Sequence, residues 1–126
     1  MSTDPAIRVL VVDDDPVCRR LLRHTLESAG MAVEEAEDLP SARLAVAGSK
    51  ADVMILDYQL PGGTGLDVWE SARTTRSNLA RKTIMLTGAL DPPERMKMAD
   101  DIALPVLGKP FQKEILLQMV EQLAQD

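Results

Sequence analysis

The sequence contains few aromatic residues and a single cysteine. Aromatic residues make up only 2% of the 126 residues, namely Tyr58, Trp69 and Phe111. The sequence therefore has few aromatic side chains on which nucleic-acid bases could stack or from which a cage for a cation could be built. Cys18 has no second cysteine with which to form a disulfide within the chain, which suits a reducing compartment. The hydrophobic core must be built from aliphatic side chains.

A long apolar run and an excess of basic residues are also missing. No stretch approaches the roughly 20 apolar residues that a membrane-spanning helix needs. The opening MSTDPAIR lacks the apolar centre of a secretory signal peptide. Fourteen Lys and Arg residues against twenty Asp and Glu residues give a net charge of -6, with no basic stripe. We therefore expect a cytoplasmic protein with no membrane insertion and no direct nucleic-acid binding.

The overall composition is that of a folded domain. Hydrophobic residues make up 45% of the chain and charged residues 27%, a balance that is typical of packed globular proteins and not of disordered tails. The length is enough for one substantial core but too short for two domains of ordinary size. We expect one domain over residues 1–126.

Short aliphatic runs alternate along the chain with longer segments of helical periodicity. The aliphatic runs have the length and composition of β-strands. They lie at residues 7–12, 31–36, 52–57, 82–87 and 104–109. Because a helical segment follows each run, the order (βα)5 predicts an α/β fold whose parallel sheet is covered by helices on both faces. In open sheets of this kind, ligands bind outside the carboxyl ends of the strands.

Start and stop signals mark the helices. Asp15 is suited to cap the first helix, Pro16 to open it and Gly30 to end it. Later helices are expected at 39–47, from the TGLD motif at 64–67, from the DPPE motif at 91–94, and around 115–123. The PGGTG segment at 61–65 is typical of a turn that needs a positive φ.

Helical spacing also predicts which side chains are buried. One face of the first helix is expected to carry Val17, Leu21, Leu22, Thr25 and Ala29. One face of the last helix is expected to carry Ile115, Leu116, Met119, Val120 and Leu123. Met96 and Met98 are interpreted as filling of the core in preference to a partner surface.

Polar side chains follow four of the predicted strands, at the point where each strand ends. They are Asp13 and Asp14 after the first, Asp57 at the third, Thr87 at the fourth and Lys109 at the fifth. Carboxylates gathered at one edge of a sheet repel each other and lose hydration, a conflict that a hard cation removes. Mg2+ prefers oxygen ligands and keeps several of its waters. The pattern therefore favours a magnesium site over acidic residues that are merely solvated.

Lys109 and Thr87 add a cationic donor and a hydroxyl, which suit an anion. A phosphoryl group has enough oxygens to contact Mg2+, the lysine and the threonine together. Asp57 is then the candidate nucleophile, because carboxylates can form aspartyl-phosphates. Taken alone, Lys109 is equally interpreted as a salt-bridge partner of an aspartate, and Thr87 as an ordinary β-former.

At this point the sequence resembles the receiver domain of two-component response regulators, in particular the single-domain, chemotaxis-regulator-like kind. The resemblance rests on VLVVDDDP, MILDYQLPGGTGLDV, IMLTG and GKPF, in this order and over nearly the whole chain. It implies a flavodoxin-like, doubly wound sheet of five parallel strands in the order 2-1-3-4-5. It also implies a signalling domain that catalyses only its own phosphorylation and dephosphorylation.

The resemblance assigns a role to each residue of the site. Asp57 is implied to accept a phosphoryl group from a sensor histidine kinase or a histidine phosphotransfer protein. Asp14 and Asp57 are implied to bind Mg2+ through carboxylates, Asp13 mainly through water, and Gln59 through its main-chain oxygen. The phosphorylated form is implied to switch binding to a downstream protein target.

The resemblance also covers the residues around the phosphoryl group. Thr87 and Lys109 are implied to hold its oxygens, and Lys109-Pro110 to be a cis peptide. Gln59 and Ala89 match positions that tune hydrolysis of the aspartyl-phosphate. Many receivers carry Tyr or Phe three residues before the lysine as a switch, but this chain has Val106. The aromatic switch that is linked to output through the surface next to that position is therefore absent from this sequence.

Two other functions remain open from the sequence. DDDPV also fits the nucleophile motif of haloacid-dehalogenase-like phosphatases, with Asp13 as nucleophile and a later acidic pair at Asp100 and Asp101. The other alternative is a receiver-like interaction module that works without phosphorylation, which Val106 favours. The sequence leaves open whether the domain stands alone or is a piece of a larger regulator or hybrid kinase.

Overall fold

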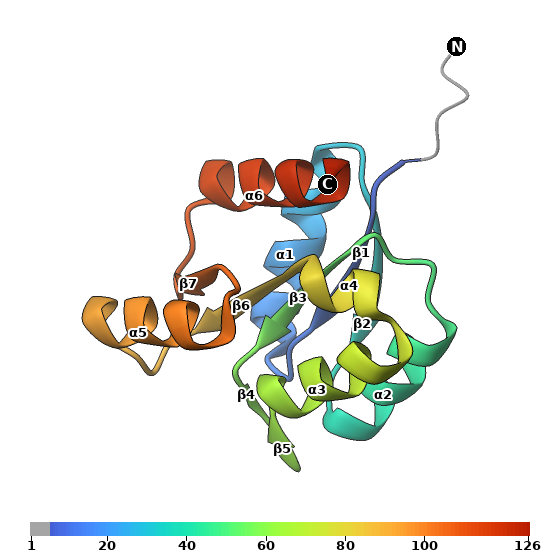
Figure 1. The fold of residues 1–126 in the computed structure, drawn as a ribbon. Helices are drawn as coiled ribbons and strands as arrows, with labels where there is room; N and C mark the ends of the chain where they lie inside the picture. Colours follow the sequence, from blue (N-terminus) through green and yellow to red (C-terminus); the bar gives the residue numbers. More distant parts are fainter. Residues whose placement is uncertain (1–5) are drawn as a thin grey trace.

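Five parallel strands form the central sheet in the order β2-β1-β3-β6-β7, in a computed structural model that describes residues 6–126 (Figure 1). The strands are β1 (Arg8–Val12), β2 (Ala32–Ala36), β3 (Val53–Asp57), β6 (Thr83–Thr87) and β7 (Val106–Gly108). Counted within this sheet, the order is the predicted 2-1-3-4-5. The last strand starts two residues later than expected, because Pro105 has no N–H to donate to the sheet.

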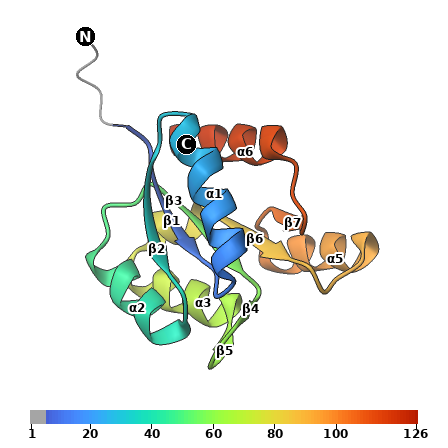
Figure 2. The ribbon, with the colours of Figure 1, turned by 180° about the vertical axis from the view of Figure 1, so that it is seen from behind.

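Helices cover both faces of the sheet, as Figures 1 and 2 show from opposite sides. The helices are α1 (Pro16–Ser28), α2 (Leu39–Gly48), α3 (Gly65–Thr75), α4 (Ser77–Arg81), α5 (Pro92–Ile102) and α6 (Lys113–Gln125). Val9 and Val11 of β1 pack with α1 and α6, whereas Leu10 and Val12 pack with α2, α3 and α4 on the other face. Successive side chains of a strand point to opposite faces, so an apolar strand such as β1 serves both layers.

Polar caps start α1 and α5 where the sequence predicts. The Asp15 carboxylate accepts a hydrogen bond from the N–H of Val17 (2.9 Å), with Pro16 as the first residue of α1. At α5, the Asp91 carboxylate accepts from the N–H of Glu94 (2.9 Å), and the Glu94 carboxylate accepts from the N–H of Asp91 (3.0 Å). These bonds satisfy N–H groups that have no partner within the helix.

The predicted buried faces are only partly right. Val17 and Leu21 of α1 are 71% and 50% exposed, and the buried residues of this helix are Leu22, Thr25 and Leu26. Successive residues of a helix are rotated by about 100°. Leu22 lies on the face of α1 that packs on the sheet, so Leu21 lies at the side of that face. Ile115 of α6 is likewise exposed, while Leu116 and Val120 are buried.

The two methionines of α5 differ in the same way. Met98 packs against the hydrophobic cluster between the sheet and helices α2, α3 and α4. Met96 is 70% exposed, so core filling is the wrong interpretation for this residue.

Two small elements escape the sequence prediction. The helix α4 has five residues, and the antiparallel pair β4 (Gln59–Leu60) and β5 (Gly63–Thr64) has two residues in each strand. Gly62 in the connection has a φ of +87°, which confirms the predicted turn. Within residues 6–126, no helix combines the length and apolarity that crossing a bilayer demands.

Candidate functional site

The parallel register of the sheet brings distant polar residues to one edge. Asp57 ends β3 and lies opposite Leu86, and Thr87 ends β6 opposite Gly108 of β7. The Lys109 N–H continues the ladder by donating to the Thr87 carbonyl (2.9 Å). Asp13 follows β1, which neighbours β3 in the sheet. The carboxyl ends of four strands thus form one site, as the (βα)5 order predicts.

One lysine joins two carboxylates at this edge. The ammonium of Lys109 donates to Asp13 Oδ2 at 2.9 Å and to Asp57 Oδ2 at 3.1 Å. Both carboxylates are buried, and the lysine side chain is 22% exposed. The salt-bridge interpretation of Lys109 is therefore confirmed. The ammonium is also in place to contact an anion attached to Asp57.

Three aspartates lie close enough to share a metal ion. One carboxylate oxygen from each of Asp13, Asp14 and Asp57 lies within 4.8 Å of the other two. Asp14 is exposed, while the other two are buried, so the group faces solvent on one side. Oxygen donors of this kind, open to water, match the preference of Mg2+. The donor set therefore fits the predicted ion.

The two buried aspartates differ in how readily they ionise. Burial raises the pKa of Asp57 to about 6, and the nearby Asp13 carboxylate adds to this rise while Lys109 opposes it. Burial acts in the same direction on Asp13, but hydrogen bonds from the Cys18 thiol, the Asp15 N–H and Lys109 outweigh it and hold its pKa below the usual value. The site thus combines Asp13, which is firmly ionised, with Asp57, whose ionised form is disfavoured by burial.

Asp13 influences the pKa of both Lys109 and Cys18. Burial alone lowers the pKa of Lys109, but its contacts with Asp13 and Asp57 outweigh burial and raise that pKa, which keeps the ammonium charged. Burial and the adjacent Asp13 raise the pKa of the Cys18 thiol to about 12. Cys18 is therefore a protonated neighbour of the site and not a nucleophile.

Three further predicted site residues lie at or just after the strand ends: Thr87 ends β6, Ala89 follows two residues later, and Gln59 begins β4. Thr87 is buried, and its hydroxyl oxygen accepts a hydrogen bond from the Ala89 N–H (3.2 Å). The Gln59 N–H donates to Asp57 Oδ1 (3.3 Å). Ala89 and Gln59 are both exposed, so they lie at the mouth of the site. The Lys109-Pro110 peptide is cis, as expected.

Val106 lies away from this group, partly buried in β7 against the cluster beneath α3. It pairs with Met85 of β6.

Gly65 is a site residue that sequence reasoning missed. A Cβ atom at this position would lie 2.5 Å from the Asp57 carbonyl oxygen and 2.8 Å from Met85 Sδ. The Gly65 N–H donates to the Tyr58 carbonyl (2.8 Å), which ties the start of α3 to the end of β3. The glycine that follows the Thr64 cap in the TGLD motif was the available signal, but the sequence pattern explained it only as part of a turn.

The phosphatase alternative does not fit this arrangement. Asp100 and Asp101 lie exposed on α5 and not at the end of a strand. Within residues 6–126, the acidic group that could share a metal with Asp13 consists of Asp14 and Asp57. The later acidic pair that this alternative requires is therefore absent from the site, and the alternative is wrong.

Comparison with known families and proteins gives one consistent match. The family model described as "Response regulator receiver domain" matches residues 9–121. Response regulator MprA of Mycobacterium sp. (strain KMS) is 36% identical over 117 residues, covering 93% of this chain and 50% of that protein. The KDP operon transcriptional regulatory protein KdpE of Escherichia coli (strain K12) is 39% identical over 103 residues, covering 82% and 44%. The chain spans about half the length of the curated relatives it matches.

Solved structures show the same fold. The chemotaxis protein CheY4 of Vibrio cholerae superposes with a TM-score of 0.79 at 30% identity, covering 94% of this chain and 99% of that one. A CheY-like response regulator receiver domain protein from Methanospirillum hungatei JF-1 gives a TM-score of 0.83 at 23% identity, covering 96% and 95%. At that identity the second likeness concerns the fold alone.

Proposed function

The chain belongs to the family of response regulator receiver domains, and from this premise we propose that Asp57 accepts a phosphoryl group from a phosphohistidine. The donor is a sensor histidine kinase or a histidine phosphotransfer protein. The observation that carries the proposal is the position of Asp57, buried at the sheet edge with the Lys109 ammonium 3.1 Å away. Asp57 offers a carboxylate for attack, and Lys109 offers a positive charge to the group that arrives.

The transfer exchanges one bond to phosphorus for another. An oxygen of Asp57 forms a bond to phosphorus while the bond from phosphorus to the imidazole nitrogen breaks. The electron pair of the broken bond stays on that nitrogen, and the imidazole leaves neutral when its other nitrogen carries a proton. Lys109 can then keep Asp13 as a partner and contact a phosphoryl oxygen in place of the Asp57 carboxylate, with the Thr87 hydroxyl donating to another.

The groups that would hold Mg2+ are Asp13, Asp14, Asp57 and the main-chain oxygen of Gln59. When bound, the ion supplies positive charge against the carboxylates and the phosphoryl oxygens. The support from this chain is the set of three carboxylates within 4.8 Å of one another.

Phosphorylation of Asp57 would act as a switch that controls binding to a downstream protein. Hydrolysis of the aspartyl-phosphate would reset it, and the exposure of Gln59 and Ala89 near the site supports a role for both in tuning that hydrolysis. We treat residues 1–126 as one receiver domain, either alone or as part of a longer regulator. A module that works without phosphorylation is the second candidate, favoured by Val106 in place of an aromatic switch residue.

Intact-protein mass spectrometry after incubation with acetyl phosphate and Mg2+ tests the proposal. We expect the mass to increase by one phosphoryl group in the wild type and to stay unchanged in Asp57→Asn and when EDTA replaces Mg2+. A wild-type protein that stays unmodified with this donor and with a phosphorylated histidine donor would favour the second candidate. Label that persists in Asp57→Asn would contradict the assignment of Asp57.

A further inference from the structure

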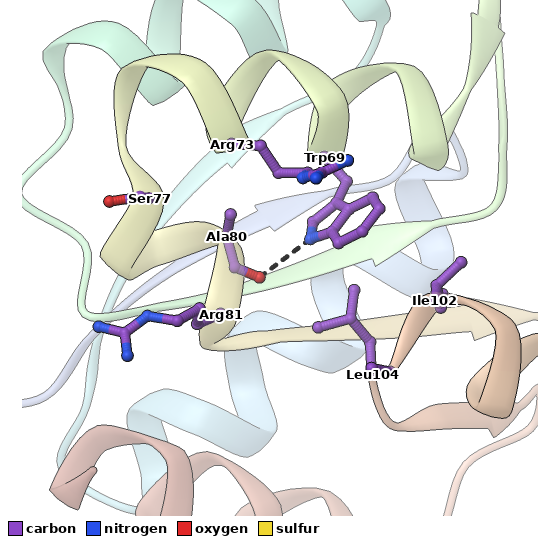
Figure 3. Close-up of a pocket in the computed structure, with 8 residues that line it drawn as sticks. Trp69, Arg73, Ser77, Ala80, Arg81, Ile102 and Leu104 are labelled. Atoms are coloured by element: carbon purple, nitrogen blue, oxygen red, sulfur yellow. Dashed lines mark hydrogen bonds between the residues drawn. The ribbon is translucent and has the colours of Figure 1, made fainter.

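A cavity of about 300 Å³ lies between α3, α4 and the end of α5, apart from the acidic site (Figure 3). The helix α4 leads into the amino end of β6, and Leu104 precedes the amino end of β7. Asp57, Thr87 and Lys109 lie at the carboxyl ends of the strands. The cavity therefore opens toward the opposite end of the sheet from the phosphoacceptor.

The floor of the cavity is apolar and contains the one tryptophan of the chain. Trp69 is partly buried, and Ile102 and Leu104 extend toward it from the end of α5 (Figure 3). The indole N–H donates to the Ala80 carbonyl (3.0 Å), which fixes the orientation of the ring. An oriented, partly buried tryptophan among aliphatic side chains is the kind of anchor that dominates protein interfaces.

The rim of the cavity is basic, although the chain as a whole is acidic. The Arg73 guanidinium lies over the indole at 5.0 Å from the ring centre, and Arg81 extends outward from α4. The described residues that line the cavity include no acid. Residues 73–82 contain Arg73, Arg76, Arg81 and Lys82 but no Asp or Glu, in a chain of net charge -6. Arg73 and Arg81, which line the cavity, therefore make its rim locally positive.

The two rim arginines remain available to a ligand. Arg73 pairs with Glu70 at 3.0 Å, but both side chains are more than half exposed, so this pair is weak and exchangeable. Arg81 contacts only the neutral side chain of Asn78 among the described residues. Arg76, by contrast, is committed to main-chain carbonyls of the protein. Guanidinium groups favour carboxylates, which they can bind in pairs of hydrogen bonds.

We infer that this cavity docks an acidic peptide segment of a partner protein, with one apolar side chain on Trp69 and carboxylates on Arg73 and Arg81. Charge complementarity selects an acidic segment, and the apolar floor requires a hydrophobic residue within it. The volume is at the lower limit for sites of free small molecules, and it suits one large side chain of a docked segment. This inference goes beyond phosphorylation and does not depend on it.

Fluorescence of Trp69 provides a direct test, because no other tryptophan contributes to the signal. The probe is a capped hexapeptide in which a Leu-Phe pair is flanked on each side by two glutamates. We expect a saturable change in fluorescence with a dissociation constant in the millimolar range or below. Replacing the glutamates by lysines, or Leu-Phe by Ala-Ala, should weaken binding roughly tenfold.

Protein variants separate docking from unspecific charge attraction. The double variant Arg73→Gln, Arg81→Gln should lose about tenfold in affinity, whereas Arg20→Gln, the same type of substitution at one exposed position of α1 on the other face of the sheet, should not. Asp57→Asn should bind the peptide normally, so a failure of the phosphoacceptor proposal does not affect this one.

Three results would overturn the inference: no saturable change, equal binding of the acidic and lysine peptides, or unchanged affinity in the double arginine variant. Saturation by 4-phenylbutyrate as tight as that by the peptide would assign the cavity to a free organic anion instead. The peptide controls need no protein variant, so the inference stays testable even if the double variant does not fold.

Discussion

Asp57 is the residue whose charge the fold accommodates least well. Burial and the neighbouring Asp13 raise the pKa of this carboxyl to about 6, against an ordinary value of 3.8. A carboxyl whose pKa is raised by folding begins to lower the stability when the pH passes its pKa in the unfolded state. The loss of stability is complete when the pH lies above its pKa in the folded state. The function proposed for Asp57 therefore uses a group that destabilises the unmodified domain at neutral pH.

Replacing this charge should stabilise the domain in a pH-dependent way. In EDTA we expect Asp57→Asn to increase the free energy of unfolding by on the order of 1 kcal/mol at pH 7.5, partly offset by the weaker contact with Lys109. The gain should shrink as the pH falls from 6 to 4, because the wild-type carboxyl takes up a proton in that window. Urea unfolding of the wild type and of Asp57→Asn at pH 7.5 and at pH 4 measures this gain. A gain that is equal at pH 4 and pH 7.5 would show that the Asp57 charge is not its cause.

Position 65 has no room for a side chain, because it lies directly against the main chain of Asp57. A methyl group at this position would meet the Asp57 carbonyl oxygen at 2.5 Å, and the main chain has little room to move there. We expect Gly65→Ala to destabilise the domain by about 2 kcal/mol and to slow labelling of Asp57. Gly48→Ala is the matched control, because its Cβ would meet no atom within 4 Å. Thermal unfolding and labelling rates of the two variants provide the comparison, and equal behaviour would contradict the crowding.

At the scale of elements, Arg76 joins three helices. It separates α3 from α4, and its guanidinium donates to the carbonyls of Val46 (3.1 Å), Ser49 and Ala51 (3.3 Å) around the end of α2. A lysine cannot reproduce this fork of donors. We expect Arg76→Lys to lower the free energy of unfolding by about 2 kcal/mol, since carbonyl groups at the end of α2 lose their partners.

Urea unfolding of Arg76→Lys beside Arg81→Lys checks this role. Arg81 is exposed and makes no contact with a main-chain carbonyl among the described residues, so its substitution should change stability by less than about 0.5 kcal/mol. Equal effects of the two substitutions would mean that the carbonyl contacts of Arg76 contribute little.

The elements also show what a sequence can predict. The central strands β1, β3 and β6 were predictable because each is a dense aliphatic run, and α1 and α5 because Asp15 and Asp91 precede prolines. The short α4 was not, because five residues contain barely more than one helical turn of pattern. Exposure of Val17 and Leu21 was missed because spacing alone does not say which part of a broad apolar face lies on the sheet.

The candidate site was predictable to a similar degree. Asp13, Asp14, Asp57 and Lys109 follow predicted strands, so a parallel sheet must gather them at one edge. The sequence could not tell that Lys109 contacts both Asp13 and Asp57, which precede it by 96 and 52 positions. These contacts depend on which strands are neighbours. The cavity at Trp69 was beyond prediction, since α4 forms part of its wall.

For the molecule as a whole, metal binding should appear as added stability. A ligand that binds only the folded state stabilises it by about 1.4 kcal/mol for each tenfold rise in concentration above its dissociation constant. We expect Mg2+ to raise the melting temperature of the wild type in this way. Asp14→Asn should lose most of the increase while changing the stability in EDTA little, because Asp14 is exposed. An equal response of wild type and variant to Mg2+ would remove Asp14 from the ligand set.

The parallel direction of all five strands makes the two ends of this molecule different in kind. A donor protein that reaches Asp57 must cover the edge where the strands finish, and it leaves uncovered the edge where β6 and β7 begin. A segment held at Trp69 would approach that second edge, so the two partners do not compete for space. Under both proposals the domain would act as a bridge, holding the protein that carries the docked acidic segment close to the phosphoryl donor of Asp57.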